Sequence, residues 1–382
     1  MKPIAILALG MFALGLDAYV VAGLLPKIGA TFDISAGEAG QAVTVFTLAY
    51  ALAAPICAGL LAGRPVRRVL GVALAIFTLA NLLSALATGL FGLLLARALA
   101  GLAAGLYAPV AITSAAALVD PGRKGRALAL TLGGMSTGTV IGVPAGLWIA
   151  DRLGWQGALW MVTILGAAAT AGILARLPDI IAAEPPSWRA RAALLTDSAI
   201  VATVAVTFLT AIASLGLYTY LASLLERAGL GGAAASHFWA WGIGGMVGSF
   251  SVGPLIDRTR DPRRIMAVIL AALTLALAWL PGLLGVSLLG YLPVLLWGAM
   301  GWASQAPQQH ALLHLRPEHG SVSVALNSSA NYLGGAAGAA LGGVVVTLAG
   351  ISALPVVAAA VAAGGLALQV VILAHARRVA GG

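Results

Sequence analysis

Two ionisable residues stand inside long apolar runs of this sequence. Asp17 lies in the run 4–25, and Arg97 lies in the run 91–118. A charge placed in hydrocarbon costs ~2.5–3.5 kcal/mol even on a lenient scale, so each charge needs a compensating partner. If the two runs are helices that cross a membrane in opposite directions, Asp17 lies about 12 Å and Arg97 about 9 Å below the same surface. We therefore expect them at similar depth.

The chemistry that such a pair can perform is reversible protonation. Burial disfavours the charged form of a carboxyl group, whereas a nearby arginine favours it. A small change in their separation then decides whether Asp17 carries a proton. Asp17 and Arg97 are predicted to couple proton binding to function, with Arg97 tuning Asp17. The alternative is a fixed ion pair or a helix clamp, because buried polar networks often only specify packing.

The elements that must position this pair are membrane-spanning helices. The 382 residues are 61% hydrophobic and 9% charged, and their mean hydropathy is +1.01. A soluble domain has roughly 25% charged residues, and a run of ~20 apolar residues is long enough to cross the hydrocarbon core. Polar breaks predict twelve spans, at 4–25, 39–61, 69–87, 91–118, 127–150, 155–176, 198–225, 233–256, 264–281, 285–306, 320–349 and 351–375. The predicted fold class is an all-α membrane protein.

The distribution of basic residues predicts the orientation of these spans. The chain has 21 Lys and Arg residues and a net charge of +9. Most of the 21 fall in segments that are cytoplasmic if the N-terminus is cytoplasmic, as the positive-inside rule requires. Both termini are therefore predicted to be cytoplasmic. The positive charge is expected to contact anionic lipid headgroups and not nucleic acid, for which no motif is present.

A repeated loop pattern divides the chain into two halves. The basic loops after the second and eighth spans share glycine and arginine spacing: Gly59, Gly63, Arg64, Arg67 and Arg68 in the first, and Gly253, Asp257, Arg258, Arg263 and Arg264 in the second. Two pseudo-symmetric six-helix bundles are therefore predicted, over 1–176 and 196–382, joined by a cytoplasmic linker over 177–195. In transporters built from parallel repeats, the substrate site is expected at the interface of the repeats, near the bilayer midplane.

Three motifs carry a resemblance to a known family. They are GLLAGRPVRRV from Gly59 to Val69, RALAGLAAG from Arg97 to Gly105, and GGMSTGTVIGVPAG from Gly133 to Gly146. Over essentially its whole length the chain resembles the major facilitator superfamily, in its twelve-helix drug/proton antiporter branch. The usual acidic residue of the first loop is replaced by Gly63, whereas the second half keeps it as Asp257. The segment LDAYVVAGLLPKI, from Leu16 to Ile28, resembles bacterial exporters of sugars, purine nucleosides, arabinose-like compounds and chloramphenicol.

This resemblance implies a secondary transporter of the bacterial inner membrane. The expected activity is proton-coupled antiport that exports small drug-like or metabolite molecules by alternating access of the two halves. The expected partners are a small-molecule substrate, protons and membrane lipids, with the chain acting as a monomer and without a cofactor or metal. Facilitated diffusion, proton-coupled uptake of a sugar or nucleoside, and a membrane sensor that does not transport remain open. An enzyme is disfavoured, since no catalytic or phosphate-loop signature stands in a suitable context.

Polar and aromatic residues inside the spans are the candidates for binding substrate. A binding site needs a few oriented hydrogen-bonding groups on a mostly apolar wall. The candidates are Tyr19, Tyr50, Asn81, Tyr107, Tyr218, Gln305, Asn327 and Asn331. For each of them, the alternative is a hydrogen bond that joins two helices.

A glycine stripe in the span 127–150 is predicted to take part in conformational gating. Glycine recurs every four residues at Gly134, Gly138, Gly142 and Gly146, and Pro144 interrupts the hydrogen-bond ladder. We expect a sliding surface between the halves, with ordinary close packing as the alternative. The spacing recurs at Gly334, Gly338 and Gly342. The predicted gating set also includes the loop residues Gly59, Gly63, Arg64, Arg67, Arg68, Asp257 and Arg258.

Histidines near the predicted loop between the tenth and eleventh spans are not expected to bind metal. His310, His314 and His319 have no cysteine and only Glu318 nearby, which is a poor ligand set. They are predicted to be solvated loop residues.

Overall fold

The computed structural model describes residues 2–61, 64–120, 123–178, 180, 194, 196–259, 261–315 and 320–381. These residues belong to two compact units, Met1–Pro185 and Pro186–Gly382. Most of the predicted linker 177–195 lies outside the described residues, as do Gly63 and His319.

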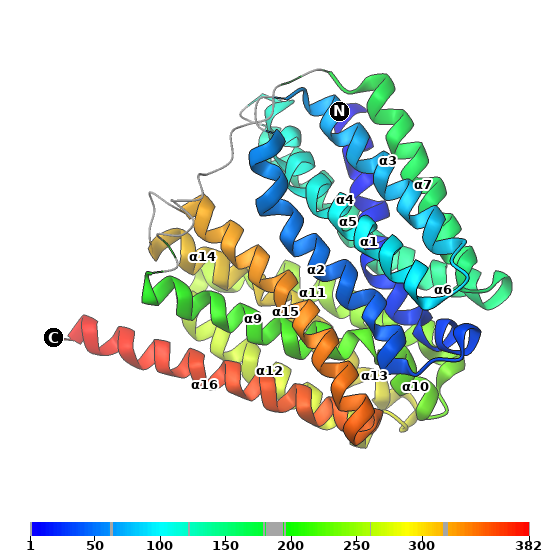
Figure 1. Ribbon diagram of the computed structural model, residues 1–382. Helices are drawn as coiled ribbons and strands as arrows, with labels where there is room; N and C mark the ends of the chain where they lie inside the picture. The colour runs from blue at the N-terminus through cyan, green and yellow to red at the C-terminus, as the bar shows by residue number, and fades with distance from the viewer. Residues whose placement is uncertain are drawn as a thin grey trace. The chain divides into compact units, whose positions relative to one another are not determined.

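The described residues of each unit form six helical rods, which Figure 1 labels by their helices. In the first unit they are α1 (Lys2–Phe32), α2 (Ala36–Leu61), α3 (Val66–Ala85), α4 (Leu90–Ala117), the continuous rod α5–η2–α6 (Lys124–Thr137, Gly138–Gly142 and Val143–Leu153) and α7 (Trp155–Arg176). In the second they are α9–α10 (Ser198–Thr219 and Leu221–Arg227), α11 (Ala234–Thr259), α12 (Pro262–Leu283), α13–α14 (Tyr291–Ala303 and Gln305–Leu315), α15 (Gly320–Ala349) and α16 (Leu354–Gly381). Short 3-10 turns η3 (Gly231–Ala233), η4 (Ser287–Gly290) and η6 (Ile351–Ala353) lie between them.

The fold class predicted from the sequence is confirmed. Apolar segments of this length satisfy their backbone groups internally only as helices, because hydrocarbon offers no hydrogen-bonding partner. Among the described residues, nine helical stretches are long and apolar enough to cross a membrane. The chain is an all-α membrane protein with twelve rods in two pseudo-symmetric six-helix bundles.

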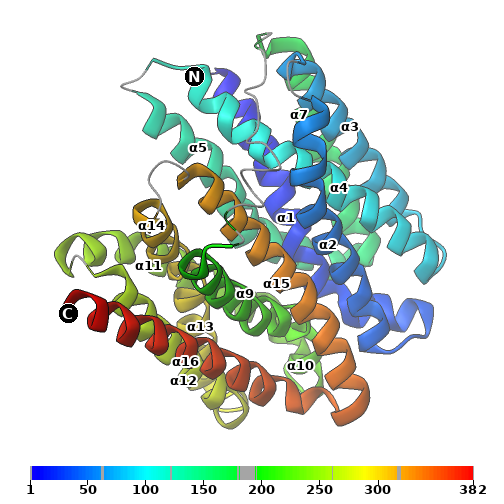
Figure 2. The ribbon, with the colours of Figure 1, turned by 60° about the vertical axis from the view of Figure 1, so that its left-hand side comes forward.

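The same pattern of helix packing occurs in both units. In the first, α1 packs on α5, α2 on α4, and α3 on α7. The equivalent rods of the second unit pair in the same way: α9 with α15, α11 with α13, and α12 with α16. Figure 2 shows α9 beside α15 and α12 beside α16. Each first rod also packs on the sixth rod of its own unit, α1 on α7 and α9 on α16. The repeat seen in the loops therefore extends to the packing within each bundle.

Local sequence signals explain where several helices begin and turn. Ser35 and Glu38 form a capping box before α2, with hydrogen bonds from Ser35 N to Glu38 Oε2 at 2.9 Å and from Glu38 N to Ser35 Oγ at 3.2 Å. The hydrogen bonds from Ser35 lower the pKa of the Glu38 carboxyl. Gly154 and Gly350 have φ angles of 77° and 79° at the equivalent turns before the last rod of each unit. Glycine adopts this left-handed conformation without steric cost.

Two helical rods extend well beyond their predicted ends. The first span, predicted at 4–25, continues as α1 to Phe32, because the chain leaves helical geometry only at Asp33, where φ is 54°. The span predicted at 285–306 is broken at Ser304 and continues as α14 to Leu315. The prediction that His310 and His314 lie in a loop is therefore wrong, since both lie on α14. Polar residues alone do not end a helix whose other face is packed.

Candidate functional site

The structure brings Asp17 on α1 and Arg97 on α4 into direct contact. An Arg97 Nη1 hydrogen is donated to Asp17 Oδ1 over 2.7 Å. The Asp17 side chain is 0% exposed and that of Arg97 is 1% exposed. This is an ion pair with both charges removed from solvent, where the charges are costly unless they remain paired.

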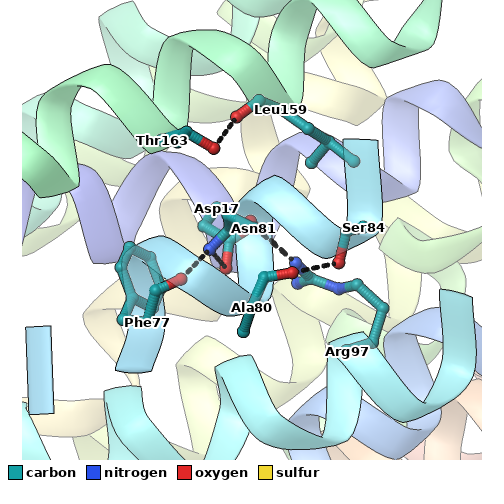
Figure 3. Close-up of polar contacts among 8 residues, drawn as sticks. All are labelled: Asp17, Phe77, Ala80, Asn81, Ser84, Arg97, Leu159 and Thr163. Atoms are coloured by element: carbon teal, nitrogen blue, oxygen red, sulfur yellow. Dashed lines mark hydrogen bonds and ion pairs between the residues drawn. The ribbon is translucent and has the colours of Figure 1, made fainter. Parts of the chain in front are cut away.

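A third helix completes the cluster through Asn81 of α3, as Figure 3 shows. Its amide nitrogen donates to Asp17 Oδ2 at 3.3 Å and to the Phe77 carbonyl at 3.1 Å. Its amide oxygen accepts from Arg97 Nη1 at 3.3 Å. Asn81 therefore contacts both charged partners. We refer to Asp17, Asn81 and Arg97 as the charge cluster.

Two further features shape the environment of Arg97. The guanidinium carbon lies 4.3 Å from the centroid of the Phe46 ring on α2, a cation–π contact. Within the described part of the chain, the buried Nε of Arg97 has no hydrogen-bond partner. The cation is thus held by one carboxylate, one amide and one aromatic face, and one of its donors is left available for another acceptor.

The other aromatic candidates of the first unit are placed differently. Tyr50 on α2 is buried and Tyr19 on α1 is half-buried. Tyr107 on α4 is fully buried, and its hydroxyl donates to the Leu7 carbonyl of α1 at 3.1 Å. That bond joins two helices of the same unit, which is the packing alternative noted for such residues.

In the second unit, Tyr218 belongs to an aromatic cluster. Its ring lies 5.1 Å from Phe238 and 4.4 Å from Trp241, centroid to centroid. Trp297 lies 6.2 Å from Trp241, and its indole nitrogen donates to Ser214 Oγ at 2.8 Å. Trp297 lies on the fourth rod of its unit and Ser214 on the first, just as Arg97 and Asp17 lie on the fourth and first rods of theirs. The equivalent contact in the second unit is neutral.

The polar candidates of the second unit lie on α14 and α15. The Gln305 amide donates to Asn331 Oδ1 at 3.0 Å, and both side chains are half-buried. Asn327, one turn before Asn331, is fully buried. The structure therefore groups Gln305, Asn327 and Asn331 within one unit.

The glycine stripe packs within its own unit. A Cβ atom added at Gly134 or Gly138 would collide with the carbonyl oxygens of Ala8 and Phe12, and one added at Gly146 would meet Val20. Ala8, Phe12 and Val20 all lie on α1. The prediction that the stripe faces the other half is wrong, because its glycines contact α1. Small residues let this neighbouring helix approach backbone to backbone. A part in gating stays a prediction.

This packing predicts a contrast between two adjacent glycines. Gly134→Ala places a methyl group against a backbone carbonyl that cannot move aside, so we expect a loss of about 2 kcal/mol of stability. Gly133→Ala is the matched control, because a Cβ there meets no atom within 4 Å, and alanine favours helix by about 1 kcal/mol. Thermal unfolding of the purified variants checks this. Equal midpoints for the two would contradict the packing of α5 on α1.

The interruption predicted at Pro144 appears as a π-helical turn over Gly138–Gly142. Proline has no backbone N–H, so the carbonyl four residues earlier loses its usual donor. Such turns are rare and occur frequently at functional sites. Here the turn lies opposite Phe12 and Leu16 of α1. Leu16 immediately precedes Asp17 in the chain.

The charged loop candidates are found at the ends of the rods. Arg64 and Arg68 are exposed and Arg67 is half-buried. Asp257 and Arg258 are exposed at the end of α11. Gly63 lies outside the described residues, and the surroundings of Gly59 are not described.

The helical fold and the buried charge cluster are together typical of a polytopic membrane transporter, and comparison with known proteins agrees with that class. The model of the Major Facilitator Superfamily matches residues 7–339. The chain is 30% identical over 376 residues to the inner membrane transport protein YdhP of Escherichia coli strain K12, which covers 97% of this chain and 95% of that protein. The chain belongs to the major facilitator superfamily, so the family resemblance is confirmed.

Two further similarities fit this assignment. A chloramphenicol resistance protein of Streptomyces lividans is 32% identical over 273 residues, which are 70% of this chain and 69% of that protein. A solved structure of a mutant nucleoside transporter, NupG, has a TM-score of 0.76 at 15% identity and covers 98% of this chain and 99% of that one. At this identity the structural likeness shows the fold alone.

Several residues of these sites were not found from the sequence. Phe46 looks like any apolar residue of a span until the structure places it against Arg97. Gln308 lies one helical turn after Gln305, and its amide donates to the Thr203 carbonyl at 3.0 Å. The spacing of Gln305 and Gln308 was the signal that could have found it, since residues three apart share a helix face.

Proposed function

We propose that this transporter is a proton-coupled antiporter that exports small drug-like or metabolite molecules by alternating access. The observation that carries the proposal is the charge cluster. Among the described residues, Asp17 is the one acidic side chain that is buried. An ionisable group inside a membrane helix is costly, and such groups commonly mark proton or substrate pathways.

The cluster couples protonation to conformation in the following way. When Asp17 is ionised, it holds α1, α3 and α4 together through Arg97 and Asn81. When Asp17 takes up a proton, the charge on Arg97 loses its counter-ion while still buried, and an arrangement that gives Arg97 another acceptor becomes favoured. Proton binding therefore shifts the population between conformations. A substrate that binds one of these conformations better is exchanged for the proton.

The remaining parts of the proposal concern location and cargo. We place the protein in the bacterial inner membrane as a monomer with both termini cytoplasmic, supported by the inner-membrane relative in Escherichia coli and by the positive charge of the predicted inner loops. The Streptomyces lividans relative, named for chloramphenicol resistance, supports export of drug-like molecules. The loop and glycine residues predicted to gate are kept as candidates for the conformational step.

Proton coupling is tested first by proton release. Chloramphenicol, sugars, nucleosides and cationic dyes are added in turn to the purified protein in weakly buffered detergent, and the pH is recorded. We expect at least one probe to displace a proton, because substrate and proton bind preferentially to different conformations of the protein. The absence of release by every probe would favour facilitated diffusion or sensing.

Antiport is then tested with the releasing probe in reconstituted vesicles. With the vesicle lumen one pH unit more acidic than the outside and the membrane potential clamped at zero, we expect about tenfold accumulation in the lumen per proton exchanged. Equilibration without accumulation would indicate facilitated diffusion, and accumulation only under the reverse gradient would indicate proton-coupled uptake.

A further inference from the structure

The second unit contains buried polar atoms that have no hydrogen-bond partner among the described residues. They include Thr207 Oγ1 on α9 and both amide atoms of Asn327 on α15. The Thr207 side chain is 2% exposed and that of Asn327 is 0% exposed. Buried polar groups in folded proteins are nearly always paired, because an unpaired one keeps its full cost of desolvation. These atoms therefore indicate hydrogen bonds that another molecule must supply.

The unpaired state of Thr207 follows from its neighbour Gln308. Thr203 and Thr210 on the same helix each donate to the carbonyl four residues earlier. For Thr207 that carbonyl belongs to Thr203, and it instead accepts the Gln308 amide of α14 at 3.0 Å. Thr207 and Gln308 thus lie beside the same carbonyl group.

Asn327 lies at the same level as Gln308. The rods α14 and α15 run antiparallel, with Gln305 bonded to Asn331 and with Leu312 and Val322 in one hydrophobic cluster. Counting residues along the two helices from these points places Asn327 of α15 at the level of Gln308. The helices α9, α14 and α15 contact one another pairwise.

We call these residues and the bonded pair Gln305 and Asn331 the amide cluster. Its members are Thr207, Gln305, Gln308, Asn327 and Asn331, and they differ in burial. Gln305 and Asn331 are half-buried, whereas the other three are buried. The half-buried pair is therefore the accessible edge. The helix break at Ser304 directly precedes Gln305, and interrupted helices commonly line the substrate sites of transporters.

The chemistry of the amide cluster selects its ligand. Every member is neutral, and every side chain both donates and accepts hydrogen bonds. A hydroxyl group also donates and accepts, so it can satisfy an amide and a threonine hydroxyl together. A cation or a carboxylate would lose its hydration here without gaining a counter-charge, which is costly.

We propose that the amide cluster binds the hydroxyl groups of neutral, hydroxyl-bearing substrates, with Asn327 and Thr207 as the groups that the ligand satisfies. This rests on the proposed transport function and names the class of molecule transported. Gln305 and Asn331 exchange their mutual hydrogen bond for bonds to the ligand as it enters.

The test is equilibrium binding of named probes to purified protein by titration calorimetry, with no proton gradient. The neutral probes are chloramphenicol, uridine and arabinose, and ethidium is the cationic probe without hydroxyl groups. We expect at least one neutral probe to bind wild type more tightly than ethidium does. Asn327→Leu and Thr207→Val should each weaken that binding about tenfold or more, as expected for lost hydrogen bonds. Thr210→Val is the matched control on α9, and it should leave binding unchanged.

Thermal unfolding of the ligand-free variants separates binding from folding. Asn327→Leu removes two unpaired polar atoms, so its midpoint should equal or exceed that of wild type. A lower midpoint with unchanged binding would show that Asn327 holds a structural water only, and would overturn the proposal. Tighter binding of ethidium than of every neutral probe would overturn it too. Proton coupling is judged separately: binding that Asn327→Leu and Thr207→Val weaken, without proton release from wild type, would keep the amide cluster and reject the coupling.

Discussion

Replacement of Asp17 by asparagine is expected to abolish proton-driven accumulation while exchange of substrate for substrate persists. The amide cannot release or take up a proton near neutral pH, but it has nearly the same shape and can still accept from Arg97. In vesicles with an acidic lumen, accumulation of the probe should fall from about tenfold per pH unit for each proton to no gradient at all. Counterflow of labelled substrate, which requires no net proton movement, should remain measurable.

The control for this result is another aspartate of the same unit. Asp151 pairs with Lys27 at 3.0 Å, and its side chain is 63% exposed. Asp151→Asn should leave accumulation unchanged, since an exposed pair contributes little. Intact accumulation in Asp17→Asn would move the proton site elsewhere and leave Asp17 with a structural role. Loss of counterflow as well would show that the variant no longer cycles, and Asp17→Glu, which restores a protonatable group, would then have to recover accumulation.

Replacement of Arg97 by leucine is expected to cost about 3–5 kcal/mol of stability. The change leaves the Asp17 carboxylate buried without its main partner, and breaking a buried pair from one side is strongly destabilising. It also removes the hydrogen bond to Asn81 and the contact with Phe46. Thermal unfolding in detergent, with and without added denaturant, measures the change.

A second substitution shows that the lost stability belongs to the ion pair. Adding Asp17→Leu to Arg97→Leu removes the unpaired charge, and apolar replacement of both partners of a buried pair is often neutral. The double variant should therefore recover most of the stability, with a large coupling free energy between the sites. Arg152→Leu, which removes an exposed arginine stacked on Trp148, should cause no measurable change. Additive effects at Asp17 and Arg97 would contradict the pairing.

Much of the charge cluster was predictable because membrane sequences permit few charges. Asp17 and Arg97 stand out against a chain with 9% charged residues, and their depths follow from counting residues along helices. Asn81 was recognised as polar and intramembrane, but it was predicted to bind substrate. Its place between Asp17 and Arg97 depends on how α3 is rotated against α1 and α4, which the number of residues in a span does not determine.

The amide cluster and the glycine stripe were also predicted only in part from the sequence. The sequence singled out Gln305, Asn327 and Asn331 by type. Thr207 was recognised only when α14 packed against α9, and so was Gln308, although its three-residue spacing from Gln305 was a signal in the sequence. The four-residue glycine spacing predicted a close helix contact, and the structure assigned that contact to α1 of the same unit. A stripe of small residues shows that a neighbour is close without showing which neighbour it is.

By itself the sequence determined the class of protein, the number of helical rods, their repeat and the rarity of charge within them. These properties follow from the solvent: hydrocarbon requires long apolar helices and makes each buried charge conspicuous. Only the tertiary structure decided which helices touch, which side chains face each other, and which polar atoms are left without partners. Those outcomes depend on the rotation and register of packed helices, which arise from the fit of many side chains at once and leave no signal at any single position.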